Sequence, residues 1–215
     1  MVLLAPQHQG YEACYQAVND SLKRFNLDYF DLYLIHWPGT SKTKLQDPVN
    51  QENRMGSYGA LEQLYKESKL RQIGVSNYTA KHLQHLLSHC SIRPHVHQFE
   101  LHPCLYQPEV LSLCRENSIQ IQAYSSLGEG RLIQDIEIPA LTEIANNLGV
   151  TKAQVLLRWA IQHDYAVIPK SKTPERVKSN ADLFSFELSD QQLAFLDNVH
   201  QTISHRFCWD PTDIY

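Results

Sequence analysis

Short apolar segments alternate along this sequence with longer amphipathic segments. Five short segments are strand-like runs bounded by turn or polar residues, at 29–36, 72–76, 96–101, 119–124 and 166–169, and a stub lies at 2–4. The longer segments space apolar residues three and four positions apart, as helices do, at 11–25, 57–70, 79–90, 107–117, 138–149 and 151–163. Alternating strands and helices in one domain require parallel strands joined by right-handed crossovers.

Residues typical of helix ends support these boundaries. Asn77 or Thr79 can cap the helix expected at 79–90, Gly149 can close one helix, and Thr151 can open the next. Thr173 followed by Pro174 is a cap with proline at the first helical position, which predicts a further helix there.

Two architectures are built from such units, a doubly wound sheet and a barrel. A doubly wound dinucleotide-binding domain would show Gly-x-Gly-x-x-Gly after its first strand, and this sequence has no such motif. The barrel is therefore favoured, although a (β/α)₈ barrel needs eight strands and about 250 residues. We predict the α/β class, as a (β/α)₈ TIM barrel lacking its first two to three strands. We expect one domain over residues 1–215, with 198–215 as a C-terminal tail.

Composition excludes several classes of protein. The net charge of −4 is not the basic field of a nucleic-acid-binding protein, and no apolar run reaches the roughly 18 residues of a membrane span. We expect a cytoplasmic protein. Five cysteines without Cys-x-x-Cys spacing predict reduced thiols. We assign no metal: His82, His85 and His89 share one expected helix, but no other ligand is placed to complete a site, so we expect them to be exposed to solvent.

Polar residues end every expected strand. In a barrel of this type the active site is built at the C-terminal ends of the strands. Those ends carry His36, Ser76 with Asn77, Gln98 with Glu100, Tyr124 with Ser125, and Lys170 with Ser171. Five such groups on one rim indicate a functional site.

The sequence resembles the aldo-keto reductases. The resemblance is carried by the runs at 10–13, 21–38, 73–77 and 168–171, and it extends over essentially the whole chain. It implies that Ser76, Asn77 and Gln98 hydrogen-bond the carboxamide of a nicotinamide cofactor and that Tyr124 stacks on the nicotinamide ring. An amide needs paired donors and acceptors, and an aromatic face fixes the side of the ring that is offered for hydride transfer.

The resemblance also places the rest of the cofactor. Ser125 and Leu127 would follow the pyrophosphate. The segment 170–178 carries four cations and one anion, which predicts a local anion site at a helix N-terminus. By resemblance Lys170, Ser171 and Arg176 lie at the adenosine 2′-phosphate and Asn180 lies at the adenine, which selects NADPH/NADP+ over NADH. Ser179 departs from the acidic or amide residue usual there, so some affinity is expected to be lost.

His36 is the catalytic residue that the resemblance assigns to this chain. In the family it neighbours a tyrosine acid, which is assisted by a lysine and an aspartate. The tyrosine and aspartate would precede residue 1, and Leu3 aligns with the lysine, so we expect three of the four catalytic groups to be absent. Trp37, Trp209 and the loop 39–56 match regions that wall the substrate pocket.

Two functions remain open. The first is an NADPH-dependent oxidoreductase that reduces aldehydes or ketones, impaired in this short form; its partner is a small carbonyl compound. The second is a noncatalytic cofactor-binding or regulatory protein on the same fold. We expect a complete member to be a monomer and this chain to self-associate, because a barrel without its first strands exposes strand edges.

Overall fold

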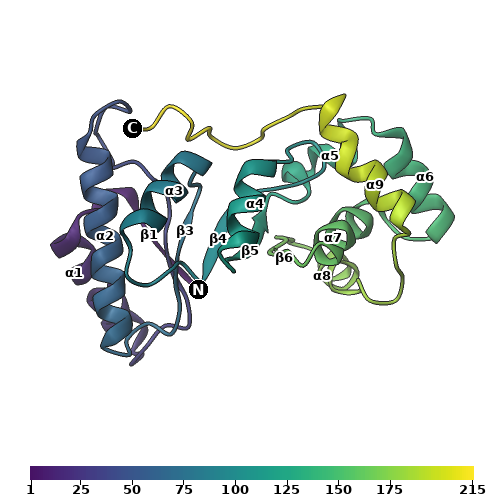
Figure 1. The fold of residues 1–215 in the computed structure, drawn as a ribbon. Helices are drawn as coiled ribbons and strands as arrows, with labels where there is room; N and C mark the ends of the chain where they lie inside the picture. Colours follow the sequence, from purple (N-terminus) through teal and green to yellow (C-terminus); the bar gives the residue numbers. More distant parts are fainter. The chain divides into compact units, whose positions relative to one another are not determined.

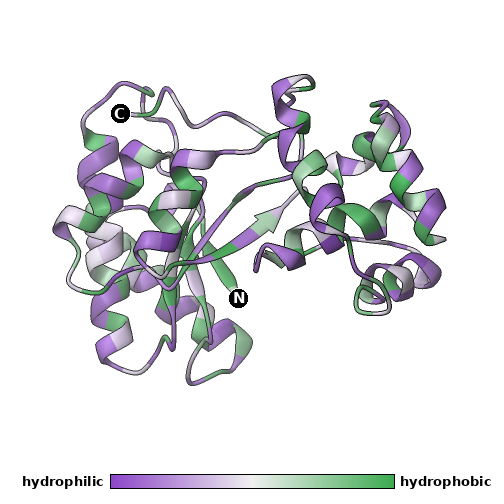
Figure 2. Ribbon diagram, turned by 45° about the vertical axis from the view of Figure 1, so that its right-hand side comes forward, coloured by the Kyte–Doolittle hydropathy of each residue, from purple (hydrophilic) through white to green (hydrophobic).

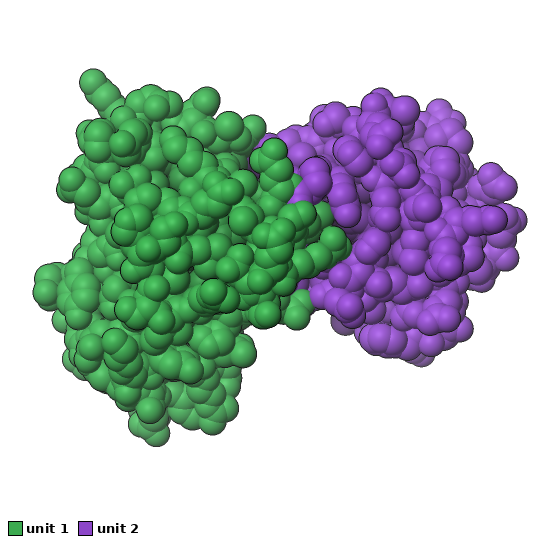
Figure 3. Space-filling model, viewed as in Figure 1, with its two compact units in different colours: residues 1–98, 109–120, 210–215 green, residues 99–108, 121–209 purple.

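The computed structural model describes residues Met1–Tyr215, which form two compact units (Figure 3). Unit 1 comprises Met1–Gln98, Glu109–Gln120 and Asp210–Tyr215, and unit 2 comprises Phe99–Pro108 and Ile121–Trp209. Neither unit is one continuous stretch of sequence.

The strands of unit 1 are parallel and follow chain order. They are β1 (Val2–Leu4), β2 (Tyr33–Ile35), β3 (Ile73–Ser76) and β4 (Val96–Glu100), whose last two residues belong to unit 2. The register places Ser76 opposite Gln98. All four strands are short, and β1 and β2 are mostly apolar, as the hydropathy colours of β1 beside the N-terminus illustrate (Figure 2). Because parallel strands in register end at one edge, the polar residues that follow them lie at that edge.

Gly74 allows β3 to pack closely against its neighbours. A Cβ atom at this position would lie 2.1 Å from the carbonyl oxygen of Val96 and 2.8 Å from Cδ2 of Leu34. Both distances are far inside van der Waals contact, so no other residue fits without moving a neighbouring strand.

Four α-helices cover the strands of unit 1. They are α1 (Tyr11–Phe25), α2 (Val49–Lys66), α3 (Ala80–His89) and α4 (Pro108–Glu116), preceded by the 3₁₀ turn η1 (Pro6–His8). On α1 the buried residues Cys14, Val18 and Leu22 recur every four positions, which puts them on one face. Helices α1 and α2 pack side by side (Figure 1).

The last residues of the chain return to unit 1. The buried side chain of Arg54 donates a hydrogen bond to the backbone oxygen of Tyr215, whose amide donates to the carbonyl of Leu45 at 2.8 Å. Nε2 of His82 lies 2.8 Å from the carbonyl oxygen of Ile214. These contacts fasten the C-terminal hexapeptide to α2 and α3.

Unit 2 holds the parallel strands β5 (Gln120–Tyr124), whose first residue belongs to unit 1, and β6 (Ala166–Val167). Its helices are α5 (Arg131–Gln134), α6 (Pro139–Leu148), α7 (Lys152–Gln162), α8 (Pro174–Ala181) and α9 (Asp190–Asn198), with 3₁₀ turns η2 (Gly128–Gly130) and η3 (Val199–Gln201). One carboxylate ties α7 to α9: Asp197 Oδ1 accepts from Trp159 Nε1 at 2.7 Å and contacts His163 Nε2 at 2.8 Å.

Most predicted elements are confirmed. The helix at 11–25 has the predicted ends, Thr79 and Thr151 are N-caps with capping boxes, and Gly149 closes α6 in the left-handed conformation. The parallel α/β class is also confirmed. None of the helices is long and apolar enough to cross a membrane.

Three elements have other bounds than predicted. The strand expected at 29–36 is Tyr33–Ile35, with only an isolated bridge from Phe30 to Leu70 before it. The strand expected at 166–169 stops at Val167. The helix expected at 57–70 begins eight residues earlier, at Val49, and ends at Lys66, so much of the predicted loop 39–56 is helical. The start was missed because the first turns of this helix are mostly polar and lack the apolar spacing that marks a helix. The helix ends before residue 70 because Ser68 adopts a left-handed conformation at φ 60°.

Candidate functional site

Three amide and hydroxyl side chains meet at the strand ends of unit 1. Ser76 ends β3, Asn77 follows it at φ 62°, and Gln98 lies opposite Ser76 on β4. The backbone N–H of Asn77 donates to the carbonyl of Gln98 at 2.8 Å, and its Nδ2 donates to Ser76 Oγ at 3.1 Å. All three residues are buried, so the group is held rigidly and offers polar atoms of both kinds.

His36 follows β2 at the same edge. Its carbonyl accepts a hydrogen bond from Nδ2 of Asn77 at 2.9 Å, and its amide donates to Leu4 at 3.2 Å. The ring lies 5.9 Å from that of Trp37, centroid to centroid. Burial lowers the pKa of His36, so the imidazole is neutral at pH 7 and can donate one hydrogen bond.

In unit 2, Tyr124 ends β5 and Ser125 turns the chain at φ 48°. Burial, with nearby Cys208 and Glu100, raises the pKa of Tyr124 well above its usual value, so the phenol stays protonated. Ser125 Oγ lies 3.4 Å from Cys208 Sγ. This contact brings the C-terminal tail next to the strand end.

The buried carboxylate of Glu100 fastens the same tail. It accepts hydrogen bonds from the backbone amides of Phe207 at 2.7 Å and Cys208 at 3.0 Å, and from Nε2 of His102 at 3.0 Å. Burial raises the pKa of Glu100, but these bonds outweigh burial and leave the pKa below its usual value. Trp209 follows with 51% of its surface exposed.

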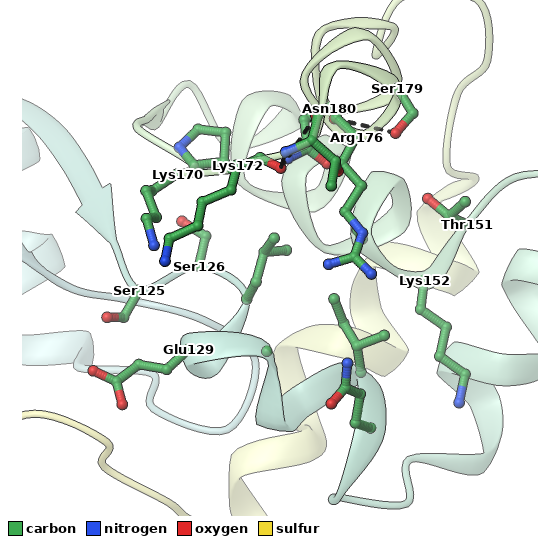
Figure 4. A pocket seen from close by; sticks show the side chains of 18 of the residues that line it. Ser125, Ser126, Glu129, Thr151, Lys152, Lys170, Lys172, Arg176, Ser179 and Asn180 are labelled. Atoms are coloured by element: carbon green, nitrogen blue, oxygen red, sulfur yellow. Dashed lines mark hydrogen bonds between the residues drawn. The ribbon is translucent and has the colours of Figure 1, made fainter.

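A pocket of about 850 Å³ lies within unit 2 (Figure 4). Six of the predicted cofactor residues line it: Ser125, Leu127, Lys170, Ser171, Arg176 and Asn180. Lys170, Lys172 and Arg176 extend into it, the arginine from the first turn of α8 (Figure 4). The fold therefore places predicted cofactor residues that lie up to 55 positions apart in the sequence, from Ser125 to Asn180, around one cavity.

The charge of this pocket is strongly positive. Its lining includes the cations Lys152, Lys170, Lys172 and Arg176 and a single carboxylate, Glu129. The N-terminus of α8 adds the positive end of a helix dipole. Such a lining can hold a phosphate group, and the planar guanidinium can bind it through two bonds.

Sequence reasoning missed some of these residues. Thr151 and Lys152 open α7 and line the pocket, as does Glu129. Nothing local in the sequence marks them, because their role depends on the packing of α7 against α8. The expectation that His82 is exposed was wrong: it is 1% exposed, because its ring is bonded to Thr79 and to Ile214 at the far end of the chain.

A profile described as "Aldo/keto reductase family" matches residues 4–201. The chain belongs to the aldo/keto reductase family. It is 44% identical over 195 residues to "Glyoxal reductase" from Bacillus subtilis, covering 91% of this chain and 66% of that protein. It is 38% identical to "9,11-endoperoxide prostaglandin H2 reductase" from Trypanosoma cruzi, covering 96% and 69% of the two chains. The chain thus spans about two thirds of the length of the curated relatives it matches.

Solved structures of the family agree with the fold. An aldo-keto reductase from a Medee basin deep-sea metagenome library has a TM-score of 0.85 at 35% identity, covering 97% of this chain and 72% of that one. A Bombyx mori aldo-keto reductase in complex with NADP has a TM-score of 0.83 at 29% identity, covering 96% and 68%. The resemblance inferred from the sequence is confirmed, and barrel closure and the missing strands stay predictions.

Proposed function

We propose that unit 2 binds the adenosine 2′-phosphate of NADPH in its cationic pocket, and that unit 1 binds a nicotinamide carboxamide at Ser76, Asn77 and Gln98. The observation that carries the proposal is the pocket itself, which gathers four cations against one carboxylate in a chain of net charge −4. An aldo-keto reductase of similar fold in complex with NADP supports the choice of cofactor.

Binding of the two nicotinamide cofactors tests this proposal. Charge-assisted hydrogen bonds are worth roughly 1.5–3 kcal/mol each, so Arg176→Met should weaken NADPH binding by about tenfold or more and leave NADH binding nearly unchanged. Isothermal titration of both cofactors measures the two dissociation constants. Lys178→Met is the matched control, because Lys178 lies on α8 but does not line the pocket. Equal losses for NADPH and NADH would reject the assignment of Arg176.

We further propose that the chain serves reduction of aldehydes or ketones. NADPH, when bound, supplies the hydride. Neutral His36 would donate a hydrogen bond to the carbonyl oxygen, on which negative charge develops during the reaction. Trp37, whose ring lies beside that of His36, would wall the substrate in unit 1. The names of the relatives, a glyoxal reductase and a prostaglandin reductase, are consistent with carbonyl chemistry.

A noncatalytic cofactor-binding role is the second candidate, and one observation favours it. Of the polar side chains at the strand ends of unit 1, only that of His36 can exchange a proton near neutral pH, and β1 contributes only apolar side chains, including Leu3 and Leu4. General acid catalysis is typically worth about 10² to 10⁴ in rate, so a chain with one weak donor should turn over slowly.

An assay of NADPH absorbance with a reactive aromatic aldehyde separates these two candidates. We expect turnover that is slow and that His36→Ala abolishes, with NADPH affinity retained in the variant. Turnover that persists in His36→Ala would remove His36 from the mechanism. No turnover at all, with NADPH still bound, would favour the noncatalytic role.

A further inference from the structure

The turn between β3 and α3 is held by an unusual set of hydrogen-bond acceptors. Residues 77–79 follow the end of β3, and each of their three backbone N–H groups donates a hydrogen bond. The first donates to the carbonyl of Gln98 at 2.8 Å. The second, of Tyr78, donates to Nε2 of His97 at 3.2 Å, and the third, of Thr79, donates to Nδ1 of His82 at 3.2 Å. Two of the three acceptors are therefore imidazole rings.

These bonds fix the tautomer of each ring. Because Nε2 of His97 accepts, its proton is on Nδ1, which lies 3.5 Å from the sulfur of Cys114. Because Nδ1 of His82 accepts, its proton is on Nε2, which donates to Ile214 at 2.8 Å. Both rings are neutral, and each uses both nitrogens. Their residues are 0% and 1% exposed, so water cannot replace either acceptor.

The two histidines also hold the side chain between them. The ring of Tyr78 meets the ring of His82 edge-on, at 5.9 Å between centroids and 71° between planes, and meets that of His97 at 6.5 Å and 78°. Tyr78 is 3% exposed. Its amide and its ring are thus fixed by the same pair of residues.

Asn77 depends on this arrangement. Its φ of 62° is a left-handed conformation, which asparagine adopts more readily than most residues and which the neighbouring contacts select here. In this conformation Nδ2 reaches the carbonyl of His36 at 2.9 Å and Ser76 Oγ at 3.1 Å. Releasing the amide of Tyr78 or Thr79 would free the turn to rotate the Asn77 side chain.

We propose that His97 and His82 are positioning residues that set the conformation of Asn77 and thereby the binding of the nicotinamide carboxamide. This inference rests on the proposed function, which places the carboxamide at Ser76, Asn77 and Gln98. Neither histidine touches the cofactor in this account, and both act through the backbone of the turn.

The experiment compares two ligands in the full chain. NADPH carries the nicotinamide, whereas adenosine 2′,5′-bisphosphate lacks it and fits only the cationic pocket of unit 2. His97→Leu removes the acceptor and should weaken NADPH binding about tenfold while changing bisphosphate binding less than twofold. His97→Gln, which places an amide oxygen near the position of Nε2, should restore most of the NADPH affinity.

A control separates positioning from loss of stability. Leu86→Ala truncates a buried side chain of α3, so it should lower the melting temperature without changing the ratio of NADPH to bisphosphate affinity. The inference is overturned if His97→Leu leaves that ratio unchanged. If the unaltered chain binds the bisphosphate but binds NADPH and NADH equally well, the proposed function is wrong. If the unaltered chain binds neither the bisphosphate nor NADPH, both the proposed function and the inference are overturned.

Hydrogen exchange in the unaltered chain gives a measurement that needs no variant. NADPH should slow amide exchange in peptides covering residues 77–79, and the bisphosphate should not. Equal protection by both ligands, or by neither, would reject the carboxamide site at this turn and with it the inference.

Discussion

Gly74 shows how a single missing side chain lets β3 lie close to both of its neighbours. We expect Gly74→Ala to destabilise the chain by more than the roughly 1–3 kcal/mol typical of overpacked sites, because the closest atom that its Cβ would meet is the backbone carbonyl oxygen of Val96. Chemical denaturation measures the loss. In Gly59→Ala, the matched control on α2, the new Cβ meets nothing closer than 3.7 Å, so this variant should be neutral or slightly stabilising. Comparable losses in both variants would contradict the account of β3.

Acid should destabilise unit 1 through its two buried histidines. Burial lowers the pKa of His82 to about 4 and that of His97 to about 3, against about 6.5 for an unfolded chain. Arg54, Lys81 and His85 face His82 and lower its pKa further. Between these values the unfolded chain binds more protons, so stability present above pH 6.5 is lost as the pH falls towards 4.

The expected slope is up to about 1.4 kcal/mol per pH unit for each histidine. Denaturant midpoints at pH 7, 6 and 5 measure this slope, and His82→Gln should reduce it because the glutamine does not titrate. A slope that is the same in the variant and in the unaltered chain would show that other groups are responsible.

At the C-terminal tail, one carboxylate accepts hydrogen bonds from two consecutive backbone amides, those of residues 207 and 208. Glu100→Gln keeps the shape of the side chain but points an amide N–H at one of the backbone donors of Phe207 and Cys208. We expect faster hydrogen exchange over the tail and faster reaction of Cys208 with a thiol reagent. Glu109→Gln, at an exposed position on α4, is the control and should change neither rate. An unaltered rate in Glu100→Gln would show that other contacts hold the tail.

Sequence patterns predicted the elements whose signal is local. Apolar runs marked β3 and β4, and the helical spacing of Cys14, Val18 and Leu22 marked α1. Helix α9 escaped notice although Ser189 and Gln192 form a capping box, which is a local signal that could have been used. The start of α2 could not be found in this way, because its first turns are mostly polar and are fixed by contacts such as Asn50 to Lys44 and Arg54 to Tyr215.

The candidate site was predictable to a similar extent. Polar residues at strand ends and the cationic segment indicated His36, Ser76 and Arg176 without structural information. The burial of His82 and the contribution of Lys152 were not predictable, because each depends on a contact with a part of the chain that is distant in sequence.

For the whole molecule, the exposed strand edges predict self-association. β1 pairs with β2 and β6 pairs with β5, and each of these outer strands has a second edge with no strand paired to it. Unpaired edges recruit further strands. We expect concentration-dependent oligomers in light scattering, together with binding of a dye for apolar surface. Leu3→Lys places a charge on β1 and should reduce the association. A monomer at all concentrations with a sharp thermal transition would contradict this prediction.

The return of residues 210–215 to unit 1 has a consequence for biosynthesis. Leu45, Arg54 and His82 bind a hexapeptide that the ribosome synthesises long after them. At roughly 5–20 residues per second, the N-terminal half must wait on the order of ten seconds for these partners. During that interval unit 1 is incomplete on the nascent chain. A stalled chain that ends before residue 210 should therefore remain sensitive to protease, and a chain in which residues 210–215 have left the ribosome should be protected.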